Sequence, residues 1–480
     1  MKHEYNTVDE TQKDPTEQTP LVDRKDASGK RGYVPVEVIS FLYFFTTFFS
    51  YPHTQFYVFD KMSAKYGGVN STDPLPCEDN NRNSSAFEVE LKVQAETSTV
   101  MMGLLFASTF SGVLPTIFIG ALTDRHGRKI ACILAIAGTT AKQLVYVAIF
   151  NLDANVNYLY IGNVLEGLCG FYGAMLVALF GTVADITEPG KQRAYRITTT
   201  EASLFLSAAA SIGVSGVWIQ ISGYLQPLYS MIAVSVINMA IVLFIFPETR
   251  KKSGAPFSLI DPLRGLKKSL MFYVIDTPDR RRWKLQISLV VFFLTFSVSI
   301  AQNTILTLFL LKSPFCWTMI HITIYAGITM VVDWLCILLL TRCLGHVLSD
   351  VNLAVMGTTS TFLSLLVIGL AVDDAMIYAG ATLGVFMEVV TPMMRSVMSR
   401  LVSSDEQGAL FGSISVVEMF SGAVLGLAAT AGYTSSVGFF PGLVFVVLAL
   451  LMAMLTCALI FLSWNLHKTK GKSTNIKLDN

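Results

Sequence analysis

Seven ionisable side chains interrupt stretches of the sequence that otherwise carry almost no charge. An ionised side chain at the centre of a bilayer costs roughly 2.5–3.5 kcal/mol even on the mildest scale, so it usually has a purpose. Carboxyl groups placed there can take up and release protons. An arginine can pair with them or with a carboxylate or sulfate ligand, because its guanidinium is a fork of donors. The seven residues are Glu166, Asp185, Glu201, Asp333, Glu388, Arg395 and Glu418.

The composition indicates that these residues lie in a membrane protein. The chain has 480 residues, of which 52% are hydrophobic and only 14% charged, whereas an ordinary soluble domain carries about 25% charged residues. Seven cysteines are too few for a disulfide scaffold, and most of them lie in apolar runs. The solvent for so much apolar surface must be lipid.

Twelve apolar stretches are long enough to cross a bilayer, which takes roughly 20 residues. They form two sets of six, so we expect an all-α membrane protein with two six-helix bundles that rock about a central site, as secondary transporters commonly do. The stretches lie near 36–59, 98–122, 130–151, 157–185, 197–221 and 226–247, and then near 285–311, 318–340, 351–372, 375–399, 408–432 and 438–464.

The distribution of Lys and Arg sets the orientation. With both termini in the cytosol, 28 of the 35 basic residues face the cytosol, five face the other side and two lie within spans, as the positive-inside rule requires. We therefore predict five regions. They are a disordered cytosolic tail (1–35), a first bundle (36–247), a cytosolic linker (248–284), a second bundle (285–464) and a cytosolic tail (465–480).

The long outer loop, 60–97, carries two glycosylation sequons, at Asn70 and Asn83. Two sequons in the long non-cytosolic loop favour a lumenal or extracellular face. Cys77 lies in the same loop and Cys316 in an outer loop of the second half, so both would meet an oxidising compartment. They either form a disulfide between the halves or remain two free thiols.

The segment GALTDRHGRK, 120–129, joins the second and third spans. It matches the pattern G-x-L-x-D-R-x-G-R-K that is typical of this loop in the major facilitator superfamily. Gly120 permits close helix approach and Gly127 a tight turn. Asp124 can accept from Arg128 or from the free N–H groups of a helix in the other bundle. We expect Gly120, Asp124, Arg125, Gly127 and Arg128 to form a conformational gate, unless the bases only obey the positive-inside rule.

A fainter copy of this segment lies in the second half. LTRCLGHV, 340–347, aligns with LTDRHGRK and keeps its Leu, Thr and Gly, with His346 at the position of Arg128.

Beyond the superfamily, the chain resembles the proton-coupled folate transporter family, solute carrier family 46, over nearly all of its transmembrane region. The resemblance rests on PHTQF (52–56), ILTLFLLKSPFCW (305–317) and TPMMRSVMSRLVSSDEQGALF (391–411). It implies the major facilitator fold and proton-coupled transport of organic anions.

The resemblance also implies roles for individual residues. It assigns proton coupling to Glu201 and substrate binding to Arg395, and it places Tyr325 and Asn303 on the cavity. It also favours the Cys77–Cys316 disulfide. We add Gln55, from PHTQF, and Phe171 to the expected substrate site.

The sequence departs from the folate carrier at three positions. Phe171 replaces an Asp, Asn163 replaces an Arg and Ser299 replaces a His, which puts folate itself in doubt. Glu418 instead resembles the branch associated with lysosomes and with conjugated steroids or muropeptide-like cargo. EQTPLV, 17–22, is a near-match to an acidic dileucine sorting signal and would recruit sorting adaptors if it acts as one.

The ionisable residues have alternative interpretations. Glu201 and Arg395, on different bundles, could pair in one conformation and separate in another, which would couple transport to protons. Glu201 could equally form a plain structural salt bridge. His53 titrates near neutral pH and is either a proton relay or a packed, hydrogen-bonded side chain, while Glu418 is a further candidate for proton coupling.

We therefore expect a proton-coupled symporter of amphipathic organic anions such as steroid conjugates, folate-like or muropeptide-like solutes. It would reside in the lysosomal or the plasma membrane, with lipid and a small anion as partners, no nucleic acid, and protons in place of a cofactor. The alternative is a non-transporting receptor with the same fold. No metal site or catalytic motif, such as H-E-x-x-H or G-x-S-x-G, lies in the spans, so we do not expect an enzyme.

Overall fold

A computed structural model describes residues 35–66, 85–249, 271, 273–274, 281–311, 314–436 and 439–478. Several predictions fall outside these residues: the disordered tail, the EQTPLV segment, most of the linker, both sequons (Asn70 and Asn83) and Cys77.

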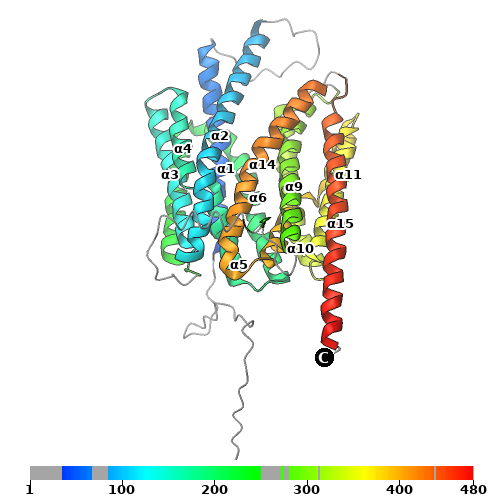
Figure 1. The fold of residues 1–480 in the computed structure, drawn as a ribbon. Coiled ribbons are helices and arrows are strands. Elements are labelled where there is room, and N and C mark those ends of the chain that lie inside the picture. Colours follow the sequence, from blue (N-terminus) through cyan, green and yellow to red (C-terminus); the bar gives the residue numbers. More distant parts are fainter. Residues whose placement is uncertain are drawn as a thin grey trace, which may run out of the picture.

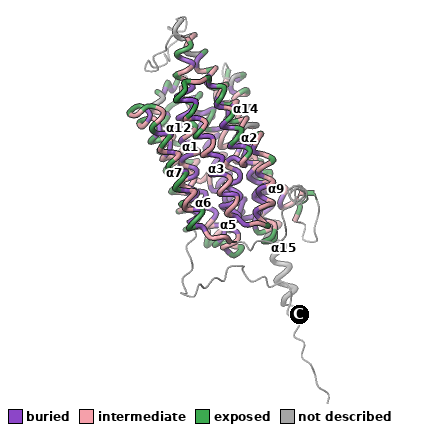
Figure 2. Tube along the Cα trace, turned by 90° about the vertical axis from the view of Figure 1, so that its left-hand side faces the viewer, coloured by how far each residue is buried: buried purple, intermediate pink, exposed green. Residues whose placement is uncertain are grey.

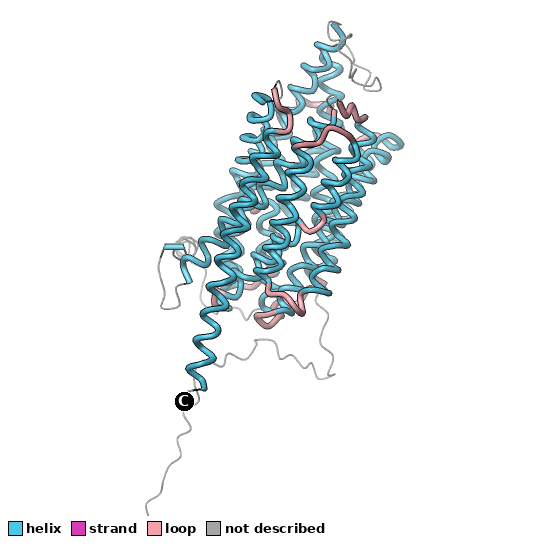
Figure 3. The backbone as a smooth tube through the Cα atoms, turned by 90° about the vertical axis from the view of Figure 1, so that its right-hand side faces the viewer, coloured by secondary structure: helices cyan, strands magenta, loops and turns pink. Residues whose placement is uncertain are grey.

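The described residues form two sets of helices and contain no strand (Figures 1 and 3). The first half comprises α1 (Val36–Lys65), α2 (Ser85–His126), α3 (Lys129–Asn151), α4 (Leu159–Leu168), α5 (Phe171–Ile186), α6 (Lys191–Ser222) and α7 (Leu225–Ala240). The second half comprises α9 (Arg281–Leu310), α10 (Met319–Leu344), α11 (Asp350–Gly369), α12 (Asp374–Gly384), α13 (Val390–Arg400), α14 (Gln407–Ser436) and α15 (Leu443–Leu478).

The architecture is the expected all-helical one. Ten described segments are long and apolar enough to cross a membrane, with α4–α5 and α12–α13 each acting as one span. α1 and α14, of 30 residues each, are not among these ten but pack alongside them, α1 against α6 and α14 against α9 and α2. The arrangement therefore accommodates the twelve expected spans, while hydropathy supports ten of them.

Two predicted spans are interrupted rather than continuous. The fourth breaks between α4 and α5, where Gly170 takes φ +90° and Phe171 takes φ +48°. The tenth breaks between α12 and α13, at a short 3₁₀ turn, Met387–Val389. These breaks occupy corresponding positions in the two halves. In transporters, paired interruptions of this kind mark the neighbourhood of the substrate site.

Side chains from neighbouring helices satisfy the backbone groups that these breaks release, as a bilayer demands. Thr116 donates to the carbonyl of Gly170 at 2.9 Å, and the Tyr43 hydroxyl donates to the carbonyl of Phe171 at 3.3 Å. In the second half, Ser360 donates to the carbonyl of Leu383 and accepts from the N–H of Phe386. Glycines 167, 170 and 173 pack closely against α2.

Three helices run past their predicted ends. α1 continues to Lys65 and α2 already begins at Ser85, so the outer loop is shorter than predicted. Lys65 pairs with Glu96 at 3.0 Å, which joins these two projecting ends (Figure 1). α15 continues to Leu478 through the segment predicted to be a cytosolic tail.

Burial follows the membrane rather than the usual aqueous pattern. Buried residues lie between the helices, and many exposed ones lie on the outside of the bundle (Figure 2). Large apolar side chains such as Phe244 and Ile221 are more than four-fifths exposed, which suits surfaces that face lipid.

Candidate functional site

An arginine flanked by two carboxylates lies between the two halves of the chain. Arg395, on α13, pairs through Nη1 with Glu201 on α6 and through Nη2 with Glu418 on α14. The three side chains are at most 6% exposed. Glu201 belongs to the first half, whereas Arg395 and Glu418 belong to the second. The Glu201–Arg395 pair that the sequence analysis allowed is thus present and bridges the halves, and the structure places Glu418 beside it.

Two aromatic rings complete the surroundings of the guanidinium. The Cζ atom of Arg395 lies 4.4 Å from the ring centroid of Phe180, on α5, and 5.0 Å from that of Phe292, on α9. Cation–π contacts of this kind stabilise a desolvated arginine. Sequence reasoning missed both phenylalanines, because nothing distinguishes them from the other apolar residues in their helices.

A carboxylate joins the halves at the end of the molecule that the basic residues assign to the cytosol, which we call the cytosolic end. Asp124, at the end of α2, accepts from the backbone N–H of Gly408 at 2.8 Å and of Ala409 at 3.0 Å. These groups lie in the first turn of α14, where N–H groups have no helical partner. The predicted contact between Asp124 and a helix of the other bundle is therefore present.

Gly120 lets the backbones of α2 and α14 meet beside this contact. A Cβ atom on Gly120 would lie 2.7 Å from the carbonyl oxygen of Gly408, and one on Gly408 would lie 2.4 Å from that of Gly120. Only glycines fit at both positions.

The turn after α2 is fixed by a network around Arg128, which is fully buried. Its guanidinium pairs with Asp124 at 3.1 Å and with Asp185 at 2.9 Å. Burial acts to lower the pKa of Arg128, but the carboxylates of Asp185 and Asp124 raise it above its usual value, so the guanidinium stays charged. Asp185 thus pairs at the cytosolic end of its helix.

The same turn supplies the start of α3. Gly127 takes φ +102°, and the Glu248 carboxylate accepts from the backbone N–H of Arg128 at 2.7 Å and from that of Lys129 at 3.4 Å. Arg125, the remaining member of the predicted gate, has an exposed side chain.

Two further contacts between the halves lie at the cytosolic end. Arg193, on α6, donates to the Ser399 hydroxyl of α13 at 3.0 Å, and Arg400 donates to the carbonyl of Gly190 at 3.2 Å. These hydrogen bonds and the close approach at Gly120 join the halves at the cytosolic end, so the structure is closed toward the cytosol.

His53 lies apart from the Arg395 site, inside the first half. Its ring is 1% exposed. Nε2 is 2.7 Å from the carbonyl oxygen of Tyr224, and the ring stacks on Phe150 with centroids 5.6 Å apart. This environment matches the packed, hydrogen-bonded alternative for His53.

The remaining predicted substrate residues are dispersed. Tyr325 packs beside Trp317 and Tyr378, near the outer end of the second half. Asn303 and Gln55 are exposed, and Phe171 lies at the break between α4 and α5. The structure brings none of these four into contact with Arg395.

Three other membrane carboxyls have distinct surroundings. Glu166 is neutralised within the first half by Lys142, at 2.8 Å. Glu388, at the break in the tenth span, accepts from Ser299 at 2.8 Å. Asp333, on α10, is half-buried.

Cys316 is disulfide-bonded, but its expected partner, Cys77, lies outside the described residues. Among the described residues, no group of three or more His, Cys, Asp or Glu could hold a metal.

Comparison with known proteins identifies the fold family. A family model described as Major Facilitator Superfamily matches residues 38–424. The chain belongs to this superfamily. It is a multi-pass membrane transporter by family, and not an enzyme.

Among curated proteins, it is similar to the proton-coupled folate transporter of Rattus norvegicus, with 27% identity over 80% of this chain and 82% of that protein. It is also similar to the lysosomal proton-coupled steroid conjugate and bile acid symporter SLC46A3 of Homo sapiens, with 25% identity over 90% of this chain and 95% of that protein. These relatives confirm the resemblance to solute carrier family 46.

Solved structures share the fold at low sequence identity. The human organic anion transporter MFSD10 (TETRAN) superposes with a TM-score of 0.67 at 16% identity, over 88% of this chain and 98% of that one. The transporter FucP in its outward conformation gives a TM-score of 0.65 at 13% identity, over 90% and 99%.

Proposed function

We propose that this superfamily transporter is a symporter that moves amphipathic organic anions together with protons by alternating access. The observation that carries the proposal is the Glu201–Arg395–Glu418 cluster, buried where the two halves meet. The relatives of this chain include proton-coupled transporters of folate and of steroid conjugates and bile acids, which supports the same substrate class here.

The charge balance of the cluster explains how coupling would work. Two carboxylates face one guanidinium, so the ionised cluster has a net charge of −1. Desolvated net charge is strongly unfavourable, and one added proton makes the cluster neutral. An anionic substrate that takes the place of Glu201 at Arg395 would bring the net charge to −2 if it bound alone, so it would bind together with a proton on that carboxyl, which keeps the net charge at −1.

The same cluster would link protons to the movement of the halves. Glu201 and Arg395 must separate when the halves move apart at the cytosolic end, because they belong to different halves. Protonation of Glu201 removes the charge attraction that opposes this separation. Glu418 stays with Arg395 in the second half and keeps the guanidinium paired during the movement.

The position of Phe180 and Phe292 around Arg395 suits a substrate that is both anionic and apolar. A carboxylate or sulfate would pair with the guanidinium, while a flat apolar body would pack on the rings. Steroid conjugates meet this description, folate-like solutes offer carboxylates and a flat ring system, and muropeptide-like solutes offer the carboxylates alone. We propose the lysosomal membrane as the site of action, with the EQTPLV segment as its sorting signal.

Uptake measurements test this function. The EQTPLV segment is altered so that the protein reaches the cell surface, and labelled folate, a steroid sulfate and a muramyl peptide are offered at acidic and neutral pH. We expect acid-stimulated uptake of one cargo, with loss of that stimulation in Glu201→Gln and loss of uptake in Arg395→Ala. Arg395→Lys controls for folding, since it keeps the charge. Cargo binding without uptake at either pH would instead establish the receptor alternative.

A further inference from the structure

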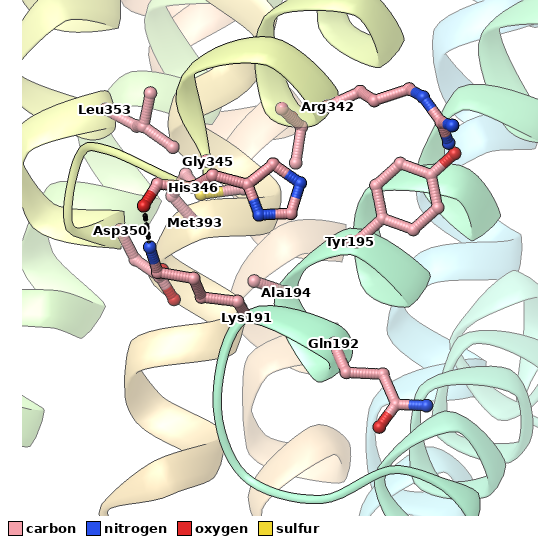
Figure 4. Close-up of a pocket in the computed structure, with 11 residues that line it drawn as sticks. Lys191, Gln192, Ala194, Tyr195, Arg342, Gly345, His346, Asp350, Leu353 and Met393 are labelled. Carbon is pink, nitrogen blue, oxygen red and sulfur yellow. Dashed lines mark hydrogen bonds between the residues drawn. The ribbon is translucent and has the colours of Figure 1, made fainter.

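A second cytosolic interface between the halves contains a cavity that the transport site does not use. The cavity has a volume of about 300 Å³ and lies between the start of α6, the end of α10 and the start of α11 (Figure 4). Lys191, in the wall of the cavity, precedes Glu201 of the transport site by ten residues on α6. Its walls therefore come from both halves of the protein.

Three basic residues and one acid are the ionisable groups in the wall of this cavity, apart from Tyr195. Lys191 comes from the first half, and Arg342 and His346 come from the second. Figure 4 shows the His346 ring between the Lys191 and Arg342 side chains, with the Tyr195 hydroxyl beside the Arg342 guanidinium. All three basic side chains are exposed.

The one acid in the wall is already paired. Asp350 forms an ion pair with Arg400 and accepts from the Ser396 hydroxyl at 2.7 Å. Lys191 uses one of its three donors on the carbonyl of His346. The cavity therefore keeps an excess of positive charge and of hydrogen-bond donors.

The internal repeat shows what this interface lacks. In the alignment of LTDRHGRK with LTRCLGHV, Asp124 corresponds to Arg342 and Arg128 to His346. At the first interface the Asp124 carboxylate binds the first turn of α14. At the second, α6 begins at Lys191 and its N-cap residue, Gly190, makes no side-chain cap, and Arg342 holds the aligned sequence position of the carboxylate.

We propose that this cavity binds an external anion of the phosphate type, which takes the structural place of the Asp124 carboxylate at the second interface. A phosphate group matches the site because it can accept charge-assisted bonds from several donors at once. The source is either the headgroup of an anionic lipid, since the cavity lies at the cytosolic end where such headgroups are found, or a soluble phosphorylated molecule.

A bound anion would also hold the halves together. It would contact Lys191 in one half and Arg342 and His346 in the other, so it favours the conformation that is closed toward the cytosol. This consequence rests on the proposed alternating-access function, whereas the binding itself does not.

Binding to the purified full-length protein tests the site without any cargo or proton gradient. The probes are inorganic phosphate, a soluble phosphoinositide headgroup, and nanodiscs of phosphatidylcholine with or without a phosphatidylinositol phosphate. The thermal midpoint and the affinity are measured for each. We expect stabilisation by the headgroup and the phosphoinositide nanodiscs if lipid is the source, and by inorganic phosphate as well if a soluble anion suffices. No stabilisation by any probe would overturn the proposal.

Variants separate this cavity from general surface charge. Arg342→Gln should weaken anion binding by roughly 10-fold, the value of one charged hydrogen bond, and His346→Gln should weaken it less. Arg282→Gln, which removes an exposed base at the start of α9, should leave binding unchanged. Equal binding in wild type and Arg342→Gln would contradict the site.

Arg342→Asp is the sharpest variant. Its carboxylate should cap α6 as Asp124 caps α14, so we expect anion binding to be lost while the thermal midpoint without anion is kept or raised. Loss of both the midpoint and the binding would show that the two interfaces are not equivalent. Failure of uptake in the transport assay would leave all these binding results in force, so the two proposals fail separately.

Discussion

The two cytosolic interfaces between the halves arise from related sequences but are completed in different ways. At the first, α2 meets α14 through two glycines, and Asp124 binds the first turn of α14. At the second, α10 approaches α6 around a cavity of about 300 Å³, and Arg342 stands where Asp124 would be. The first interface thus carries its own anion, whereas the second offers donors to one. If the second interface binds an anion as we propose, closure at the first interface depends on the protein alone and closure at the second depends also on that anion.

The largest effect is expected from filling the glycine contact at the first interface. Gly408→Val places a side chain against the backbone of α2, where even a Cβ atom would lie 2.4 Å from the Gly120 carbonyl oxygen. Backbone cannot move aside as a side chain can, so the cytosolic end should no longer close, and uptake should be abolished. Thiol labelling of a Ser399→Cys reporter, at a buried position between the halves, measures the opening.

Gly426→Val is the matched control for this variant. It lies on the same helix, α14, and a Cβ atom there meets nothing within 4 Å. We expect near-normal uptake and a protected reporter. If both valine variants behave alike, the helix and not the contact is responsible.

The second effect comes from removing charge at the first interface. Asp124→Asn weakens two charge-assisted hydrogen bonds to α14 and the ion pair with Arg128. Each hydrogen bond to a charged group contributes about 1.5–3 kcal/mol, so the reporter should become at least ~10-fold more reactive. Without added anion, Arg342→Gln at the second interface should change the reporter far less. Equal effects of the two variants would remove the distinction between the interfaces.

The smallest effect is expected at the start of α3. Glu248→Gln leaves an oxygen that can accept from the backbone of Arg128 but removes the negative charge from the helix N-terminus, an interaction of about 0.3–1 kcal/mol. The thermal midpoint should fall slightly while uptake stays near normal. A large loss of uptake would mean that Glu248 belongs to the gate itself.

Sequence reasoning recovered the parts of the molecule that depend on composition and local pattern. Apolar length predicted the spans, and the GALTDRHGRK motif predicted both the turn at Gly127 and the contact of Asp124 with the other half. Intramembrane charge selected Glu201, Arg395 and Glu418, because the energy of a charge in lipid makes such residues conspicuous in any sequence.

The rest depended on tertiary contacts that no local pattern encodes. The break at Gly170 is tolerated because Thr116, more than fifty residues away, bonds its carbonyl. Phe180 is selected by its distance to Arg395 and by nothing in its own helix. The sequence could not distinguish a proton relay from a packed side chain at His53, because Tyr224 and Phe150, which surround it, lie far away in the sequence.

The measurement that tests the central claim most directly is simultaneous recording of cargo and protons in proteoliposomes. The purified protein is reconstituted with a pH-sensitive dye inside, and an inward proton gradient is applied with the transported cargo outside. We predict cargo accumulation accompanied by internal acidification that depends on the cargo, with both signals coupled in wild type and uncoupled in Glu201→Gln. Cargo movement without proton movement, or coupling that survives in Glu201→Gln, would contradict the account.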